Sequence, residues 1–222
     1  MKINKLNYIQ NRKHWCWAVA CKLVGEQYKK THSEFQFSII STNPEKCGQV
    51  TLFEYEHGVV TENREGLRRW LQYEDEVRVD AWQRAIVMNA NTCKYIGYDG
   101  DAAGDDEAKV RGIKYYLTGD IYSDKVQVET LGFYKDSMSL WDQYRDRIME
   151  SFRRHEYIIG NVVLHNNNAY HSMVILCIVE DKVMLYNTAD GELLYYSAEE
   201  VFCKGFKSCL GIGIVKWIQR IV

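Results

Sequence analysis

The sequence of residues 157–187, YIIGNVVLHNNNAYHSMVILCIVEDKVMLYN, decides the fold of the C-terminal half of this chain. It contains apolar runs rich in β-branched residues at 157–164, 170–179 and 182–187, which short polar stretches separate. Runs of this length and composition, bounded by turn-forming residues, are typical of strands joined by hairpins. We therefore expect these runs to form an antiparallel sheet.

Further elements surround this sheet in the sequence. Alternation in KVQVETLGFY (125–134) predicts a strand, and GIGIVKW (211–217) predicts another. Ser139 with Asp142 forms a capping-box pattern that is followed by apolar residues at helical spacing, and Ser197 with Glu200 predicts a second, short helix. The C-terminal half is therefore rich in strands.

The N-terminal half has a helical pattern. From Trp17, apolar residues recur at helical spacing to Tyr28, and the apolar arc is so wide that we expect a buried central helix, with Lys22 and Glu26 on its polar side. Further helices are predicted over about 61–73 and after Asp80 as N-cap, with loops over 31–60.

The order of elements predicts an α+β fold in one domain over residues 1–222. A mainly helical lobe (1–110) should pack on a sheet-rich lobe (111–222), with a cleft between them. The segment YDGDAAGDDEAK (98–109) departs from a calcium-loop pattern because Ala103 and Val110 occupy ligand positions, so we expect an exposed acidic loop there.

Composition excludes several classes of function. A net charge of −2, from 28 basic and 30 acidic residues, gives no basic surface for nucleic acid. The longest apolar stretch, MVILCIV, is too short to cross a membrane, and the absence of a signal peptide predicts a cytoplasmic location. Seven cysteines without a CxxC pair predict reduced thiols, no metal site and no cofactor.

Cys16 is the candidate nucleophile. It stands at the predicted start of the first helix, where free N–H groups and the helix dipole favour a thiolate. Cys21, five residues further on, belongs to the apolar stripe and fits a buried structural thiol. The same alternative, a buried thiol, applies to Cys16.

His171 is the candidate base, because it opens a strand directly after a polar loop. His165 in that loop is the competitor, and His14 is too close to Cys16 in sequence. Asn187 could orient the imidazole if a bulge shifts the hairpin register, whereas a two-residue turn would place Asp190 opposite His171 instead.

Gln10 completes the candidate set. Its side-chain amide and the backbone N–H of Cys16 could together bind the oxyanion of a tetrahedral intermediate. Each of these residues alone is weak support for a catalytic site. Their order along the chain, Gln10, Cys16, His171 and Asn187, is far more specific for one.

In these residues the chain resembles papain-like cysteine peptidases. QNRKHWCWAVA keeps the Gln-x5-Cys-Trp-Ala spacing of the family, and the interval from His171 to Asn187 also matches. YHSMVILCIVEDKVMLYNTADGE is similar to the compact bacterial branch, which includes leader-processing peptidases and effector proteases. The resemblance covers residues 8–30 and about 138–217. The lysosomal branch has other residues where this chain has Lys13, Trp15 and Thr188.

This resemblance implies a papain-like fold and hydrolysis of a peptide or protein substrate by Cys16, His171, Asn187 and Gln10. Trp15 and Trp17 are candidates to line the cleft. An acyltransferase with the same thiol chemistry and a non-catalytic binding module are the alternatives. An effector exported without a classical signal is the alternative to a cytoplasmic location. Substrate identity and oligomeric state stay open.

Overall fold

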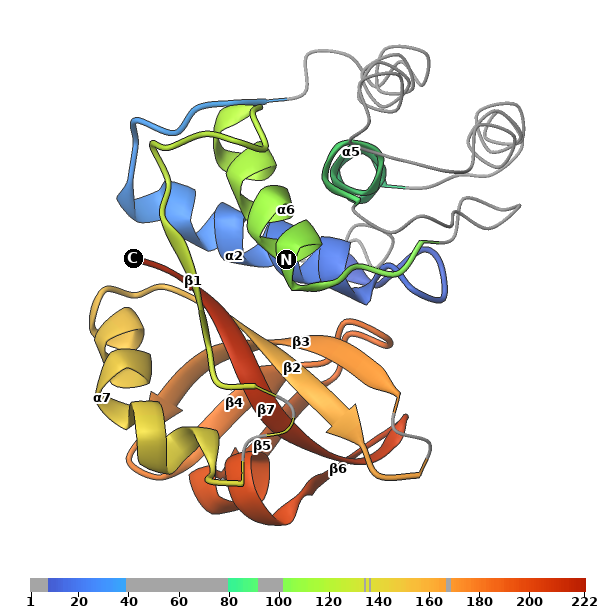
Figure 1. Cartoon of the computed structure of the whole chain (residues 1–222), viewed down its shortest axis with the longest axis vertical. Helices are drawn as coiled ribbons and strands as arrows, with labels where there is room; N and C mark the ends of the chain where they lie inside the picture. Colours follow the sequence, from blue (N-terminus) through green and yellow to red (C-terminus); the bar gives the residue numbers. More distant parts are fainter. Residues whose placement is uncertain (1–7, 39–79, 92–101, 134, 136, 167–168) are drawn as a thin grey trace.

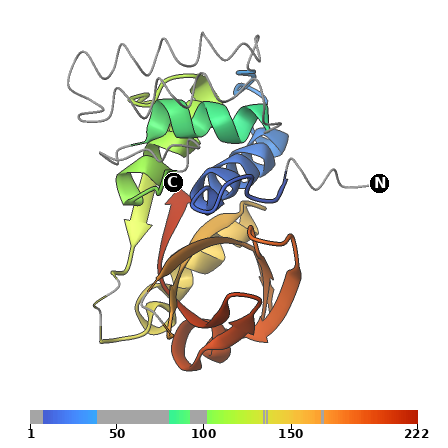
Figure 2. The same cartoon turned by 90° about the vertical axis from the view of Figure 1, so that its right-hand side faces the viewer.

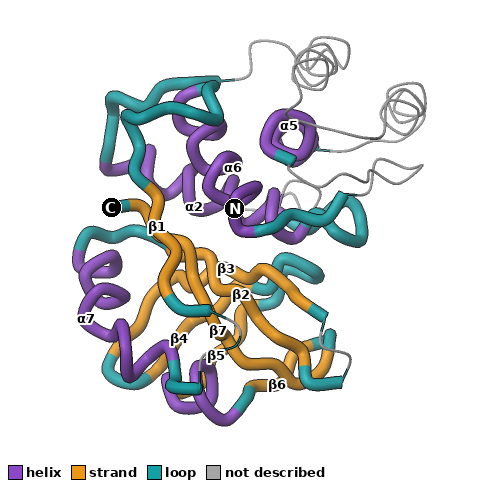
Figure 3. Tube along the Cα trace, viewed as in Figure 1, coloured by secondary structure: helices purple, strands orange, loops and turns teal. Residues whose placement is uncertain are grey.

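The structure is a computed structural model that describes residues 8–38, 80–91, 102–133, 135, 137–166 and 169–222. It has helices on one side and an antiparallel sheet on the other, which confirms the α+β class (Figures 1 and 3). The loops expected over 39–60 and the helix expected over 61–73 lie outside the described residues. Among the described residues, no helix combines the length and apolar character needed to span a membrane.

The helical layer consists of α2 (Cys16–Thr31), α5 (Ala81–Ala90) and α6 (Asp106–Thr118). As expected, the first turns of α2 are buried all round, from Trp17 to Cys21. Lys22 was expected on the polar side of α2, but it is 4% exposed. It is buried because its Nζ lies 3.2 Å from the Asp80 carboxylate at the N-terminus of α5.

Helix α6 contradicts the exposed acidic loop expected over 98–109, of which residues 98–101 lie outside the described residues. The aspartates instead start the helix: the Asp105 side chain accepts from the Ala108 N–H, and Asp106 and Glu107 lie in the first turn, where they complement the dipole. Gly112 permits close packing of α6 on α2, since a Cβ there would lie 2.8 Å from the Cys21 sulfur.

Within the described residues, the sheet contains seven strands in the order β1-β7-β2-β3-β4-β5, with β6 paired to β7. It curls into an open barrel shape (Figure 2). The strands are β1 (Val128–Leu131), β2 (Ile158–Leu164), β3 (Tyr170–Val179), β4 (Lys182–Tyr186), β5 (Leu193–Ser197), β6 (Phe206–Ser208) and β7 (Gly211–Ile221). The predicted sheet is confirmed, while β5 and β6 were not predicted.

Both faces of β3 are buried, which explains its continuous apolar sequence. Val174 packs against the helical layer, in a core that contains Trp17, Ile86 and Ile113. Met173 points into the interior of the curled sheet, where helix α7 (Leu140–Arg153) and η2 (Glu200–Lys204) supply further apolar residues. The predicted cap of α7 is present, because Ser139 Oγ accepts from the Asp142 N–H at 3.1 Å.

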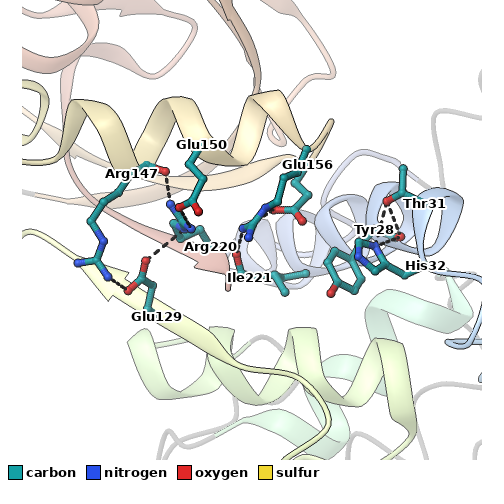
Figure 4. A network of polar contacts seen from close by, with 10 residues as sticks. Tyr28, Thr31, His32, Glu129, Arg147, Glu150, Glu156, Arg220 and Ile221 are labelled. Atoms are coloured by element: carbon teal, nitrogen blue, oxygen red, sulfur yellow. Dashed lines mark hydrogen bonds and ion pairs between the residues drawn. The ribbon is translucent and has the colours of Figure 1, made fainter.

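A buried arginine joins α7 to the sheet edge. Arg220 on β7 is 1% exposed, donates to the backbone carbonyl of Arg147 and forms ion pairs with Glu129 (3.2 Å) and Glu150 (2.6 Å). Figure 4 shows Arg220 between these groups of β1 and α7. The arginine therefore fixes α7 over one end of the sheet.

We expect Arg220→Met to lower the free energy of unfolding by about 2 kcal/mol, because the apolar stem is kept but the buried hydrogen bonds are lost. Urea unfolding followed by circular dichroism measures the change. Arg153→Met, at an exposed position in the last turn of α7, is the matched control and should change stability by less than about 0.5 kcal/mol. Equal stability of the two variants would contradict a structural role for Arg220.

Candidate active site

Cys16 is the first residue of α2, and its side chain is half-buried. No side chain caps this helix; the Ala18 and Val19 N–H groups donate to the Trp15 carbonyl at 3.0 and 3.2 Å, whereas the N–H groups of Cys16 and Trp17 precede the first intrahelical hydrogen bond. Tyr8 to Trp15 precede the helix and cross from the sheet to the helical layer. The position agrees with the sequence prediction that Cys16 stands at a helix start.

His171 is the second residue of β3 and is 5% exposed. Its imidazole lies close enough to the Cys16 thiol for each side chain to shift the pKa of the other. Burial alone would raise the pKa of Cys16, but the hydrogen bond and charge of His171, together with the Ser172 N–H, lower that pKa below its usual value. Burial would lower the pKa of His171, but Cys16 and then Asn187 raise it.

Asn187 directly follows β4 and is fully buried. Its Oδ1 lies 2.9 Å from His171 Nε2 and also accepts from the Ala189 N–H at 3.1 Å. Because Oδ1 can only accept, His171 Nε2 carries a proton, which leaves Nδ1 for the sulfur. Asn187 therefore fixes both the tautomer and the orientation of the ring.

The hairpin register explains how Asn187 reaches His171. The turn has two residues, Glu180 and Asp181, which alone would have favoured Asp190 as the partner. A bulge at Leu176 on β3 shifts the register by one residue, which the assignment of Asn187 required. Asp190 accepts from the Glu192 N–H at 2.9 Å and acts on the pKa of His171 only through its charge.

Thr188 links three parts of the site. Its hydroxyl donates to the Ser172 carbonyl at 2.7 Å and lies 3.3 Å from His171 Nε2. Its carbonyl accepts from the Gln10 N–H at 2.9 Å. Thr188 is fully buried, so these contacts are shielded from water. The end of β4 therefore holds both the imidazole and the segment that contains Gln10.

Gln10 lies in the segment that precedes α2. Its Nε2 donates to the Lys13 carbonyl at 2.8 Å, which leaves the second amide hydrogen for another acceptor. Its Oε1 is buried without a hydrogen-bond partner among the described residues. The amide nitrogen is thus directed by Lys13 toward the turn that leads into α2.

The prediction for Trp15 and Trp17 is wrong. Their exposed fractions are 0% and 1%, so neither can contact a substrate. Trp17 Nε1 donates to the Ala102 carbonyl at 3.0 Å, and its ring packs against Gly104. Both rings belong to the core because the first turns of α2 are buried on every side.

The other candidates from the sequence lie elsewhere. His14 and His165 are exposed, and the backbone of His165 belongs to the sheet edge. Cys21 is fully buried, its thiol donates to the Lys109 carbonyl at 3.3 Å, and burial raises its pKa strongly. Cys21 therefore stays protonated, in contrast to Cys16.

Besides Thr188, two further contributors to the site were not predicted. Lys109 on α6 is buried, pairs with Asp106 at 3.3 Å, and its charge lowers the pKa of Cys16. Cys209, in the turn between β6 and β7, accepts from Asn187 Nδ2 at 3.3 Å. Both come from segments far from Cys16 in sequence, and only a correct assignment of α6 could have drawn attention to Lys109.

The coupling of Cys16 and His171 predicts a measurable pH effect. Because Cys16 is the main group that raises the pKa of His171, Cys16→Ala should lower that pKa, so that the imidazole loses its proton at lower pH. NMR titration of the histidine ring carbons measures both proteins, with His14 as internal control. An unchanged His171 titration in the variant would show that the two groups are not coupled.

Among the residues described here, no group of three or more histidine, cysteine or acidic side chains is arranged to hold a metal ion. The site thus consists of a cysteine, a histidine and an asparagine, with a glutamine nearby. Comparison of the chain with protein-family models, with curated proteins and with solved structures gave no match.

Proposed function

We propose that this protein is a papain-like cysteine peptidase that cleaves a peptide or protein substrate. The observation that carries the proposal is that Cys16 and His171 lie close enough to shift each other's pKa, while Asn187 Oδ1 lies 2.9 Å from His171 Nε2. The packing of a buried helix, which begins at the cysteine, on a curled antiparallel sheet that bears the histidine further supports it.

The opposed pKa shifts of Cys16 and His171 favour a thiolate and an imidazolium at neutral pH. The thiolate attacks the carbonyl carbon of the scissile bond, a C–S bond forms, and the carbonyl electrons move onto oxygen. The backbone N–H of Cys16 and the free amide hydrogen of Gln10 stabilise this oxyanion.

Collapse of the tetrahedral intermediate breaks the C–N bond. His171 gives its proton to the leaving amine, and the acyl group remains on Cys16 as a thioester. The neutral imidazole then removes a proton from water, which attacks the thioester carbonyl carbon. The C–S bond breaks, which releases the carboxylic acid and restores the Cys16 thiolate and the His171 imidazolium. Asn187 keeps the ring in place during both proton transfers.

The experiment is to profile a diverse peptide library by mass spectrometry in water enriched in ¹⁸O, with and without glycinamide. We expect cleavage at a restricted set of sequences, with ¹⁸O in the new carboxylates. Transfer of the acyl group mainly to glycinamide would instead assign the chain to the acyltransferases. No cleavage and no transfer would leave a binding module and refute the proposal.

A further inference from the structure

We infer that Gln83 on α5 is a positioning residue for Gln10, an inference that rests on the proposed role of Gln10 as oxyanion donor. Gln83 is fully buried. Its Oε1 accepts from the Asn11 N–H at 3.0 Å, and its Nε2 donates to the Ile9 carbonyl at 2.9 Å. One side-chain amide therefore holds the backbone on both sides of Gln10.

The backbone of Gln10 itself is held from the opposite direction. Its N–H donates to the Thr188 carbonyl at 2.9 Å, at the end of β4. The carbonyl of Tyr8, two residues before Gln10, accepts from the Tyr186 hydroxyl at 2.8 Å. Residues 8–11 thus bridge α5 and the sheet. The backbones of Tyr8 and Gln10 are held from the sheet side, and those of Ile9 and Asn11 are held by α5.

The start of α5 is itself rigid, so Gln83 provides a firm support. Asp80 caps the helix by accepting from the Gln83 N–H at 2.9 Å, and its carboxylate pairs with buried Lys22 of α2. The backbone N–H of Asp80 donates to the Asn11 side chain at 2.6 Å. Helices α2 and α5 are therefore locked together at the point where Gln83 meets the segment.

This arrangement gives Gln83 a role in catalysis without contact with the reacting atoms. An oxyanion donor contributes only if it is placed before the charge develops, and small displacements remove much of the effect. Loss of the two Gln83 hydrogen bonds leaves the Ile9 carbonyl with the Asn11 Nδ2 donor at 3.0 Å and removes the Gln83 acceptor of the Asn11 N–H. The backbone on both sides of Gln10 is then held less firmly, and the Gln10 amide samples several positions. The pair of Cys16 and His171 should persist, because the hydrogen bonds that hold the imidazole come from Asn187 and Thr188.

The test is Gln83→Met, which keeps the shape of the side chain but removes both hydrogen bonds. With the best peptide of the library, we expect kcat to fall about tenfold to thirtyfold, a part of the loss known for complete removal of an oxyanion donor. KM should stay within about twofold of the wild-type value. Alkylation of Cys16 by iodoacetamide, which forms no oxyanion, should keep its wild-type rate and pH dependence.

The matched control is Gln27→Met. Gln27 also joins a helix to a backbone carbonyl of the other layer, that of His155 at 2.8 Å, but at the far end of α2. Gln27→Met should leave kcat unchanged. In a Gln10→Ala background, Gln83→Met should lower kcat by less than about twofold, because a residue that acts through Gln10 has nothing left to position.

Hydrogen exchange separates the inference from the proposed function. In Gln83→Met the Gln10 N–H should exchange at least about tenfold faster, although its own partner, the Thr188 carbonyl, is untouched. The inference would be overturned if the exchange rate of the Gln10 N–H did not change. It would also be overturned if Gln83→Met lowered kcat equally in the wild-type and Gln10→Ala backgrounds. Neither result would affect the finding that the wild type cleaves peptides. Faster exchange in a protein that cleaves nothing would support the positioning and refute the function instead.

Discussion

Replacement of Cys16 by alanine is expected to abolish peptide cleavage, with a fall in kcat of about 10⁵-fold or more, as for removal of a catalytic nucleophile. The reason is that the acyl group has no other acceptor in the site. Cys16 is half-buried at the start of α2, so the loss of its sulfur should change the free energy of unfolding by less than about 1 kcal/mol. Cleavage and urea unfolding of the same sample measure both quantities.

Cys21→Ala is the control for this prediction. Cys21 lies on the same helix, is fully buried and has a raised pKa, so its thiol stays protonated. The variant should lose about 1 kcal/mol of stability through a small cavity but keep most of its activity. Full activity of Cys16→Ala, or inactivity of a folded Cys21→Ala, would show that the nucleophile has been assigned to the wrong residue.

Replacement of Asp80 by alanine should have the largest effect on stability, about 4 kcal/mol. Its carboxylate and the Lys22 ammonium are 8% and 6% exposed, so removal of the acid leaves a buried positive charge. The same change removes the cap of α5, which accepts from the Gln83 N–H at 2.9 Å. Urea unfolding followed by tryptophan fluorescence gives the value.

Two further variants separate charge from packing at Asp80. Asp80→Asn together with Lys22→Met removes both charges and keeps the cap, and should recover at least half of the lost stability. Glu107→Ala breaks an ion pair with Arg111 on the surface of α6 and should cost less than about 0.5 kcal/mol. If Asp80→Ala lowers the free energy of unfolding no more than Glu107→Ala does, the buried ion pair of Asp80 and Lys22 does not stabilise the fold.

Local sequence signals predicted those elements whose own residues include a helix start signal or a regular apolar spacing. Ser139 and Asp142 marked the start of α7, Asp80 marked α5, and the wide apolar arc after Trp17 marked a buried α2. The strands β2, β3 and β4 followed from their composition. The structure agrees with these predictions because local preference and burial favour the same element there.

Other features depend on partners that are distant in the sequence. Lys22 is buried only because Asp80 lies beside it, and Trp15 and Trp17 are buried because the helices and the sheet enclose them. The choice between Asn187 and Asp190 depended on a bulge at Leu176 that no residue pattern in the strand announces. Helix α6 was missed because glycines and aspartates favour loops unless a helix N-terminus uses the acids.

The pairing of Cys16 with His171 is tested most directly by the rates at which iodoacetamide modifies individual cysteines at pH 6, measured by peptide mapping. Cys203 and Cys209 are exposed, whereas Cys16 is half-buried. If His171 holds Cys16 as a thiolate, Cys16 will react at least about tenfold faster than both, and His171→Ala will remove this advantage. Slower reaction of Cys16 than of the exposed cysteines, with the same pH dependence as theirs, would contradict an activated nucleophile at this site.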